Sequence, residues 1–183
     1  MKRISLLFLF FSFLGISSAS AGESGSWRQE VADVFSNIWK SDRHQLIIPL
    51  NTFHVRSTYD KEKIAKYNEM PWGLGVERYY VSQSGITHSI YGVVFKDSHN
   101  QFSPTFGYNW EKKWPLTADG DWSVGAGFTT LLTFRKKEDY IPIPGIIPLL
   151  SVGYKRVTFQ TVWIPHMGHN HGNIFFSMMK WSF

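Results

Sequence analysis

The stretch VVFKDSHNQFSPTFGYNW, residues 93–110, decides the fold. It joins two predicted strands, and in the second strand residues with aromatic side chains alternate with residues that are small or polar. From residue 102 onward, aromatic residues share one face: Phe102, Phe106, Tyr108 and Trp110. Small or polar residues share the other face: Ser103, Thr105, Gly107, Asn109 and Glu111. A soluble sheet buries its apolar face in a core, whereas a membrane barrel turns that face to lipid. The remaining sequence distinguishes these two folds.

Residues 1–21 have the pattern of a secretory signal that is cleaved from the mature protein. Lys2 and Arg3 form a basic start, residues 4–16 an apolar core, and residues 19–21 a small-residue cleavage site. No later segment holds the roughly 18 consecutive apolar residues that a membrane-spanning helix needs. The sequence therefore predicts an exported protein whose residues 22–183 form one domain.

The composition narrows the class of fold further. Aromatic residues make up 17% of the chain and cysteine is absent, so an exported domain of this size gains no stability from disulfides. Closing a sheet into a barrel within a bilayer is another route to stability, because it leaves no free strand edge. The net charge of +5 includes no basic run or nucleic-acid-binding motif, so we expect no nucleic-acid partner.

Residues 26–40 are predicted to form a helix. Ser26 and Gln29 match a capping box. Apolar residues recur on one side at helical spacing: Trp27, Val31, Phe35, Ile38 and Trp39. An amphipathic helix with a tryptophan at each end suits a membrane interface, and packing against its own barrel is the alternative.

From about residue 46 the period changes to two and stays there. We predict eight strands at residues 46–57, 72–81, 86–97, 102–113, 121–135, 148–155, 156–164 and 172–183. The apolar face of residues 122–134 argues against a secreted soluble barrel, whose outer faces would be polar. The sequence therefore predicts an all-β fold, an eight-stranded antiparallel transmembrane β-barrel (residues 46–183) with an N-terminal amphipathic α-helix.

Four prolines lie at or within predicted strand ends: Pro49, Pro71, Pro148 and Pro165. Each removes a hydrogen-bond donor from the ladder, and for any one of them simple strand termination is a sufficient explanation. Together they indicate that neighbouring strands are left unpaired there. In a membrane barrel this would open lateral gaps wide enough for a lipid tail.

Three polar residues at predicted strand ends are candidates for chemistry: His54, Asp97 and Ser98. A histidine transfers protons near neutral pH, a carboxylate fixes its tautomer, and a hydroxyl attacks or contacts an ester carbonyl. Because neighbours in a strand point to opposite faces, Asp97 and Ser98 can both approach His54 only if a turn intervenes. Spacing alone therefore does not establish a hydrolase triad.

The histidines at positions 166, 169 and 171 have a spacing that could bind a metal, but neither regular structure nor a nearby carboxylate supports them. Solvated loop histidines are the preferred interpretation. The sequence also lacks a nucleophile elbow, a phosphate loop and a complete dinucleotide fingerprint. We therefore expect neither a metal nor another cofactor.

Several short motifs resemble those of a known family: residues 59–63 (YDKEK), 67–69 (YNE), 71–73 (PWG), 95–98 (FKDS), 140–142 (YIP), 151–154 (SVGY), 157–160 (VTFQ) and 172–173 (GN). On these motifs, the chain resembles the lipid A palmitoyltransferases of the PagP family over nearly all of its mature length. The last strand also ends at Phe183 with apolar residues in phase behind it, as in bacterial outer-membrane barrels.

The resemblance implies an outer-membrane barrel that moves an acyl chain, usually palmitoyl, from the sn-1 position of a phospholipid to lipid A. It places catalytic roles on His54, Asp97 and Ser98, with Asp97 supporting the histidine. It also implies that Pro49 and Pro71 border one lateral opening, and that Pro148 and Pro165 border the other. The expected partners are a phospholipid donor, lipid A and the outer membrane, with the protein acting as a monomer.

One position departs from the best-known members of the family. Asn109 stands where they have a glycine at the floor of the acyl pocket. A larger floor residue shortens the cavity, so we expect a chain shorter than palmitate unless other changes rebuild the pocket. The alternative function is a non-catalytic barrel that binds lipid or stabilises the envelope, and such a barrel would be indifferent to changes at Ser98.

Overall fold

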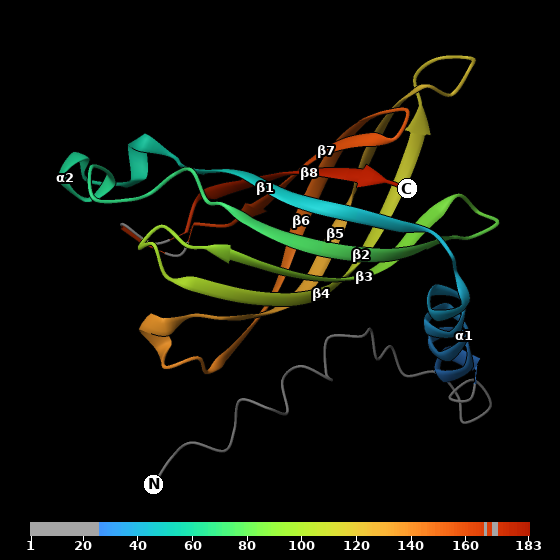
Figure 1. Cartoon of the computed structure of the whole chain (residues 1–183), viewed down its shortest axis with the longest axis horizontal. Coiled ribbons are helices and arrows are strands. Elements are labelled where there is room, and N and C mark those ends of the chain that lie inside the picture. The colour runs from blue at the N-terminus through green and yellow to red at the C-terminus, as the bar shows by residue number, and fades with distance from the viewer. Residues whose placement is uncertain (1–25, 167, 170–171) are drawn as a thin grey trace, which may run out of the picture. The chain divides into compact units, whose positions relative to one another are not determined.

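The computed structural model describes residues 26–166, 168–169 and 172–183 (Figure 1). The predicted signal sequence and His171 lie outside these residues. The chain divides into two units, residues up to 37 and from 38 onward, and each is described by itself. Among the described residues, no helix is long and apolar enough to cross a membrane.

Helix α1 spans Ser26–Lys40, as predicted. The second unit is a closed barrel in which the eight strands pair antiparallel in sequence order. The strands are β1 (His44–His54), β2 (Gly73–Val81), β3 (Ile86–Lys96), β4 (Phe102–Pro115), β5 (Trp122–Phe134), β6 (Pro142–Tyr154), β7 (Val157–Ile164) and β8 (Ile174–Ser182). Short helical segments lie between strands: η1 (Arg56–Thr58), α2 (Lys61–Ile64) and η2 (Lys136–Glu138). The predicted antiparallel barrel and its N-terminal helix are confirmed.

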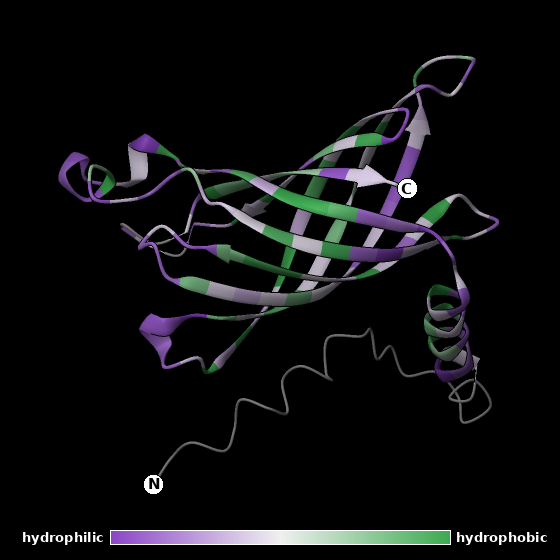
Figure 2. Ribbon diagram, viewed as in Figure 1, coloured by the Kyte–Doolittle hydropathy of each residue, from purple (hydrophilic) through white to green (hydrophobic). Residues whose placement is uncertain are grey.

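The barrel has two unlike ends. The segments 55–72, 97–101 and 135–141 and the described residues of 165–173 (165, 166, 168, 169, 172 and 173) lie at what we call the loop end, which carries α2 on the left of Figure 1. The connections 82–85, 116–121 and 155–156 lie at the opposite end, the turn end. Figure 2 shows hydrophilic residues concentrated at α2 and η2, with hydrophobic residues along the strands.

The alternation predicted for residues 102–111 is present in β4. Phe102 and Phe106 are about half exposed on the outside of the barrel, whereas Ser103, Thr105 and Asn109 are buried inside it. The same holds for the other strands, whose exposed residues include Trp122, Ile146, Leu150, Phe175 and Trp181. The outside of the barrel is therefore apolar, and its interior contains most of the buried polar groups.

The sixth strand corrects a prediction. Residues 136–147 were expected to form a long loop, but β6 begins at Pro142 and pairs with β5 as far as Phe134. Prolines normally argue against a strand, because each lacks an N–H donor. Here the first half of β6 is bonded only to β5, since its ladder with β7 starts at Leu149. A strand with one free edge tolerates prolines.

The ladder between β1 and β2 is interrupted in a similar way. It pairs only His44 to Ile47 with Gly75 to Arg78, and it stops two residues before Pro49. Pro71 precedes β2, Pro148 directly precedes the first residue of β6 that pairs with β7, and Pro165 directly follows β7. The two interruptions thus lie beside the four prolines, both toward the loop end.

Candidate active site

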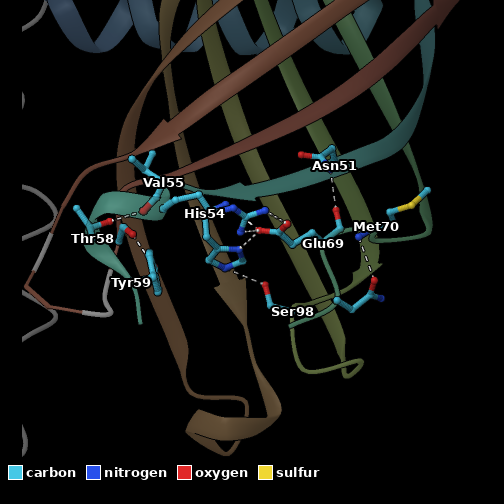
Figure 3. Close-up of polar contacts among 11 residues, drawn as sticks. Asn51, His54, Val55, Thr58, Tyr59, Glu69, Met70 and Ser98 are labelled. Carbon is cyan, nitrogen blue, oxygen red and sulfur yellow. Dashed lines mark hydrogen bonds and ion pairs between the residues drawn. The ribbon is translucent and has the colours of Figure 1, made fainter. Parts of the chain in front are cut away.

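His54 is the last residue of β1, and the inward phase of that strand directs its imidazole into the barrel. Only 2% of the residue is exposed. Its Nε2 lies 3.3 Å from the Ser98 Oγ, so the two predicted residues are brought together (Figure 3). The rings of Tyr59 and Tyr67 lie 5.1 and 4.7 Å from the imidazole between centroids. These rings shield the imidazole from water.

Glu69, in the segment before β2, holds the other side of the imidazole (Figure 3). The His54 Nδ1 lies 3.0 Å from the Glu69 Oε1, and the His54 backbone N–H donates to the same oxygen. An ionised carboxylate only accepts hydrogen bonds, so Nδ1 carries the proton and Nε2 is free to accept one from Ser98. The result is a hydroxyl, imidazole and carboxylate in series.

Arg56 fixes Glu69 in turn. Its guanidinium donates two parallel hydrogen bonds to the carboxylate, of 2.8 and 2.6 Å. Burial alone would raise the pKa of the Glu69 carboxyl, but the hydrogen bonds from Arg56 and His54 lower it to about 2. Glu69 is therefore ionised across the range in which a histidine titrates. Its backbone oxygen also accepts a hydrogen bond of 2.9 Å from the Thr52 N–H.

Asp97 has a different place from the one expected. Its Oδ1 accepts hydrogen bonds from the backbone N–H groups of His99 (2.9 Å) and Gln101 (3.0 Å), and its Oδ2 lies 3.5 Å from an Arg135 nitrogen. It thus stabilises the turn between β3 and β4, while Glu69 occupies the position beside His54 that we had expected of Asp97. Strand alternation no longer applies after β3 ends at Lys96, so Asp97 and Ser98 both line the same cavity.

Sequence reasoning missed the role of Glu69. The residue lies within the recognised motif at 67–69, but 15 positions from His54 in an irregular segment, where periodicity predicts no orientation. One signal in the sequence could have indicated this role. Arg56 and Glu69 have opposite charges and lie near the two ends of the connection that follows His54.

A cavity of about 460 Å³ extends inward from the loop end. Asp97, Ser98 and Arg135 line it toward that end, while Asn109 and Lys180 line it farther inside. Most of its wall is aliphatic or aromatic, including Val93, Phe95, Ile147, Val162, Phe176 and Met178. Such a lining suits a hydrocarbon chain with its polar end near His54 and Ser98.

Asn109 lies on the inner face, as the alternation predicted, and it is almost fully buried. Its amide Nδ2 donates to the Glu77 Oε1 (3.2 Å) and to the Ser89 Oγ (3.1 Å). These partners satisfy the amide in an otherwise apolar cavity, which offsets much of the cost of burying it.

The histidine loop shows no arrangement of metal ligands among its described residues. His169 Nε2 lies 3.1 Å from the Asp60 Oδ1 on the surface of the loop end, and His166 is exposed. Across the described part of the chain, no three histidine, cysteine or acidic side chains form a group able to hold a metal ion.

Comparison with known proteins places the chain in a family. Residues 34–180 match the family described as "Antimicrobial peptide resistance and lipid A acylation protein PagP". The chain belongs to the PagP family. The resemblance found in its short motifs is thereby confirmed.

Relatives cover almost the whole chain. A PagP protein of Sodalis glossinidius, named lipid A acyltransferase, is 43% identical over 190 residues that span all of this chain and 97% of its own. One of Dickeya chrysanthemi with the same name is 41% identical over 98% of this chain and 92% of its own. A third, of Laribacter hongkongensis, is 45% identical over 86% of this chain and 74% of its own.

Proposed function

We propose that this PagP protein transfers a fatty acyl chain from the sn-1 position of a phospholipid to a hydroxyl of lipid A in the bacterial outer membrane. The observation that carries the proposal is the series formed by Ser98, His54 and Glu69 at the loop end of a closed-ended apolar cavity. The apolar outside of the barrel supports a location in a bilayer, with the loop end facing outward.

The geometry supports a division of labour. The His54 Nε2 accepts the proton of the acceptor hydroxyl while that oxygen attacks the ester carbonyl, with the Ser98 hydroxyl contacting the carbonyl oxygen. The carbon–oxygen bond to the glycerol then breaks, and the proton held by His54 passes to the departing oxygen. The products are an acylated lipid A and a lysophospholipid, and no acyl-enzyme is required.

Glu69 acts as a positioning residue in this scheme. It holds the Nδ1 proton of His54 and so presents Nε2 as the base. Asp97 contributes by stabilising the turn that carries Ser98 and by its ion pair with Arg135 at the cavity wall.

The two interrupted ladders supply routes for the lipid tails. Beside Pro49 and Pro71, β1 and β2 are unpaired toward the loop end, and beside Pro148 and Pro165 the same is true of β6 and β7. In this proposal a tail passes laterally between the unpaired strands from the bilayer into the cavity, without leaving an apolar environment. We propose that Asn109 at the closed end selects a chain shorter than palmitate. The protein acts as a monomer.

Mass spectrometry of lipid A tests the proposal. Cells expressing the wild-type protein should show lipid A with one added acyl chain, and the mass of that chain measures the cavity. Cells expressing Ser98→Ala or His54→Ala should lack it at equal amounts of folded barrel. Lipid A of unchanged mass in cells whose membranes contain folded wild-type barrel would instead support a lipid-binding or structural role.

A further inference from the structure

Lys180 lines the inner end of the cavity and forms an ion pair with Glu77, which does not itself line the cavity. Lys180 of β8 and Glu77 of β2 point into the barrel, and their side chains are 4% and 3% exposed. The Lys180 Nζ lies 2.5 Å from the Glu77 Oε2. The other oxygen of Glu77 accepts the hydrogen bond from Asn109, which also donates to the fully buried Ser89.

The cavity ends at this level on several strands. On β4 its inner lining stops at Asn109, and the next inward residue, Glu111, is buried beyond it. On β7 the lining stops at Gln160, and on β8 at Lys180. Lys180 therefore lies at the bottom of the cavity, where the end of an inserted acyl chain would arrive, and Glu77 holds Lys180 there from outside the lining.

We propose that Glu77 and Lys180, rather than Asn109 alone, determine which acyl chains the protein accepts. The inference rests on the proposed acyl transfer. It specifies an acyl substrate class with an abrupt upper limit on length and a gradual lower one, because the two limits have different physical causes.

The lower limit comes from lost burial. A chain shorter than the cavity leaves apolar wall unfilled, and each missing methylene weakens binding about fourfold. The upper limit comes from the charges. A chain longer than the cavity must separate or displace a buried ion pair, and an uncompensated buried charge weakens binding by about a hundredfold or more.

The first experiment uses the full-length protein in detergent micelles with lipid A and phospholipid donors whose acyl chains differ by one carbon. Around the preferred length, transfer should fall about fourfold per carbon on the short side and about a hundredfold at the first excluded length on the long side. A wild-type profile that falls equally on both sides would overturn the inference.

A double variant removes the charges while conserving volume. In the Glu77→Gln, Lys180→Met variant, transfer at the first excluded length should fall only about tenfold or less. Flexible neutral side chains can move aside to make room for an extra methylene. The control is Glu111→Gln with Lys113→Met, which removes a partly exposed ion pair (3.6 Å) of which neither residue lines the cavity, whereas Lys180 does. Its length profile should equal that of the wild type. A folded Glu77→Gln, Lys180→Met protein with an unchanged step would refute the assignment.

Binding separates this inference from the proposed reaction. Lysophospholipids of graded chain length should bind the purified wild-type barrel with the same abrupt upper limit. If they do while no acyl chain is transferred from any donor, the proposed acyl transfer is overturned and the length limit set by Glu77 and Lys180 is supported. If transfer occurs but neither measurement shows the abrupt limit, the proposed length limit is overturned and the proposed transfer is supported.

Discussion

The two halves of the barrel interior are built from opposite kinds of side chain. Toward the loop end the interior is an apolar cavity, and the ladders beside it are interrupted at two places. Toward the turn end it is filled by buried polar and charged groups, including Glu77, Glu111 and Lys180, between paired strands. We infer from the difference that one barrel separates two tasks: the proposed ligand binding and chemistry in one half, and cross-linking of the strands in the other.

Loss of His54 should produce the largest effect on activity. General acid–base catalysis contributes about 10²–10⁴ in rate, so His54→Ala should lower kcat/KM by that factor. The lost contacts with Glu69, Tyr59 and Tyr67 should also lower the unfolding midpoint, but the protein should still fold. Transfer assays on purified barrels and thermal melts in the same detergent measure both. The exposed His166→Ala is the control, with no change expected. Full activity of His54→Ala would contradict the assignment of the catalytic base to His54 at the loop end.

Loss of Lys180 should instead reduce stability. Lys180→Ala leaves Glu77 buried without its counter-charge, which costs about 3–5 kcal/mol in the free energy of unfolding. Lys155→Ala breaks an exposed ion pair with Asp121 and should cost about 1 kcal/mol or less. Urea unfolding in detergent compares the two variants. Equal costs would show that the turn end is not held together by its buried charges.

Replacing the carboxylate beside the base should have an intermediate effect on activity. Glu69→Gln removes the charge that holds the Nδ1 proton, and we expect kcat/KM to fall about 10- to 100-fold, mainly through kcat. The pH profile of kcat should change as well, because the imidazole loses its ionised partner. An unchanged profile with lower activity would indicate a structural role alone.

Asn109→Gly tests the boundary between the two halves. Removing this side chain enlarges the closed end, so the preferred chain should lengthen by about one or two methylenes, each worth about 0.8 kcal/mol. The abrupt upper limit should persist, because the charges of Glu77 and Lys180 remain. Donors of graded length measure the shift, and an unchanged optimum would mean that Asn109 does not limit chain length.

The last effect concerns acid stability. The pKa of Glu69 is lowered from 4.5 to about 2 in the folded protein, so its ionised form stabilises the fold at any pH above about 4.5. The difference in unfolding free energy between wild type and Glu69→Gln should shrink as the pH falls from 4.5 toward 2. Between pH 8 and pH 5 this difference also includes the titration of His54, which loses its ionised partner in the variant. A difference that does not shrink below pH 4.5 would assign the acid linkage to another group.

Periodicity predicted the barrel because the interior and exterior of each strand differ so strongly, as Phe106 and Asn109 show. It failed for the first half of β6, where Pro142 and Pro144 hid a strand segment that needs donors on only one edge. At the site, the sequence named His54 and Ser98 as candidates but left open whether Ser98 could approach His54, and the structure places their side chains 3.3 Å apart. The role of Glu69 was not predicted, because an irregular segment brings this residue next to β1. The periodicity of the sequence does not predict the path of an irregular segment.

The ladder interruptions also divide the barrel into two groups of strands. Strands β7, β8 and β1 form one continuous hydrogen-bonded group, and β2 to β6 form the other. Toward the turn end the groups are joined by four residue pairs between β1 and β2 and six between β6 and β7. Local opening needs the least free energy where the fewest backbone bonds must break, so amide hydrogen exchange will be fastest along these two seams. We therefore expect the loop end to widen around a bound chain more readily than the turn end.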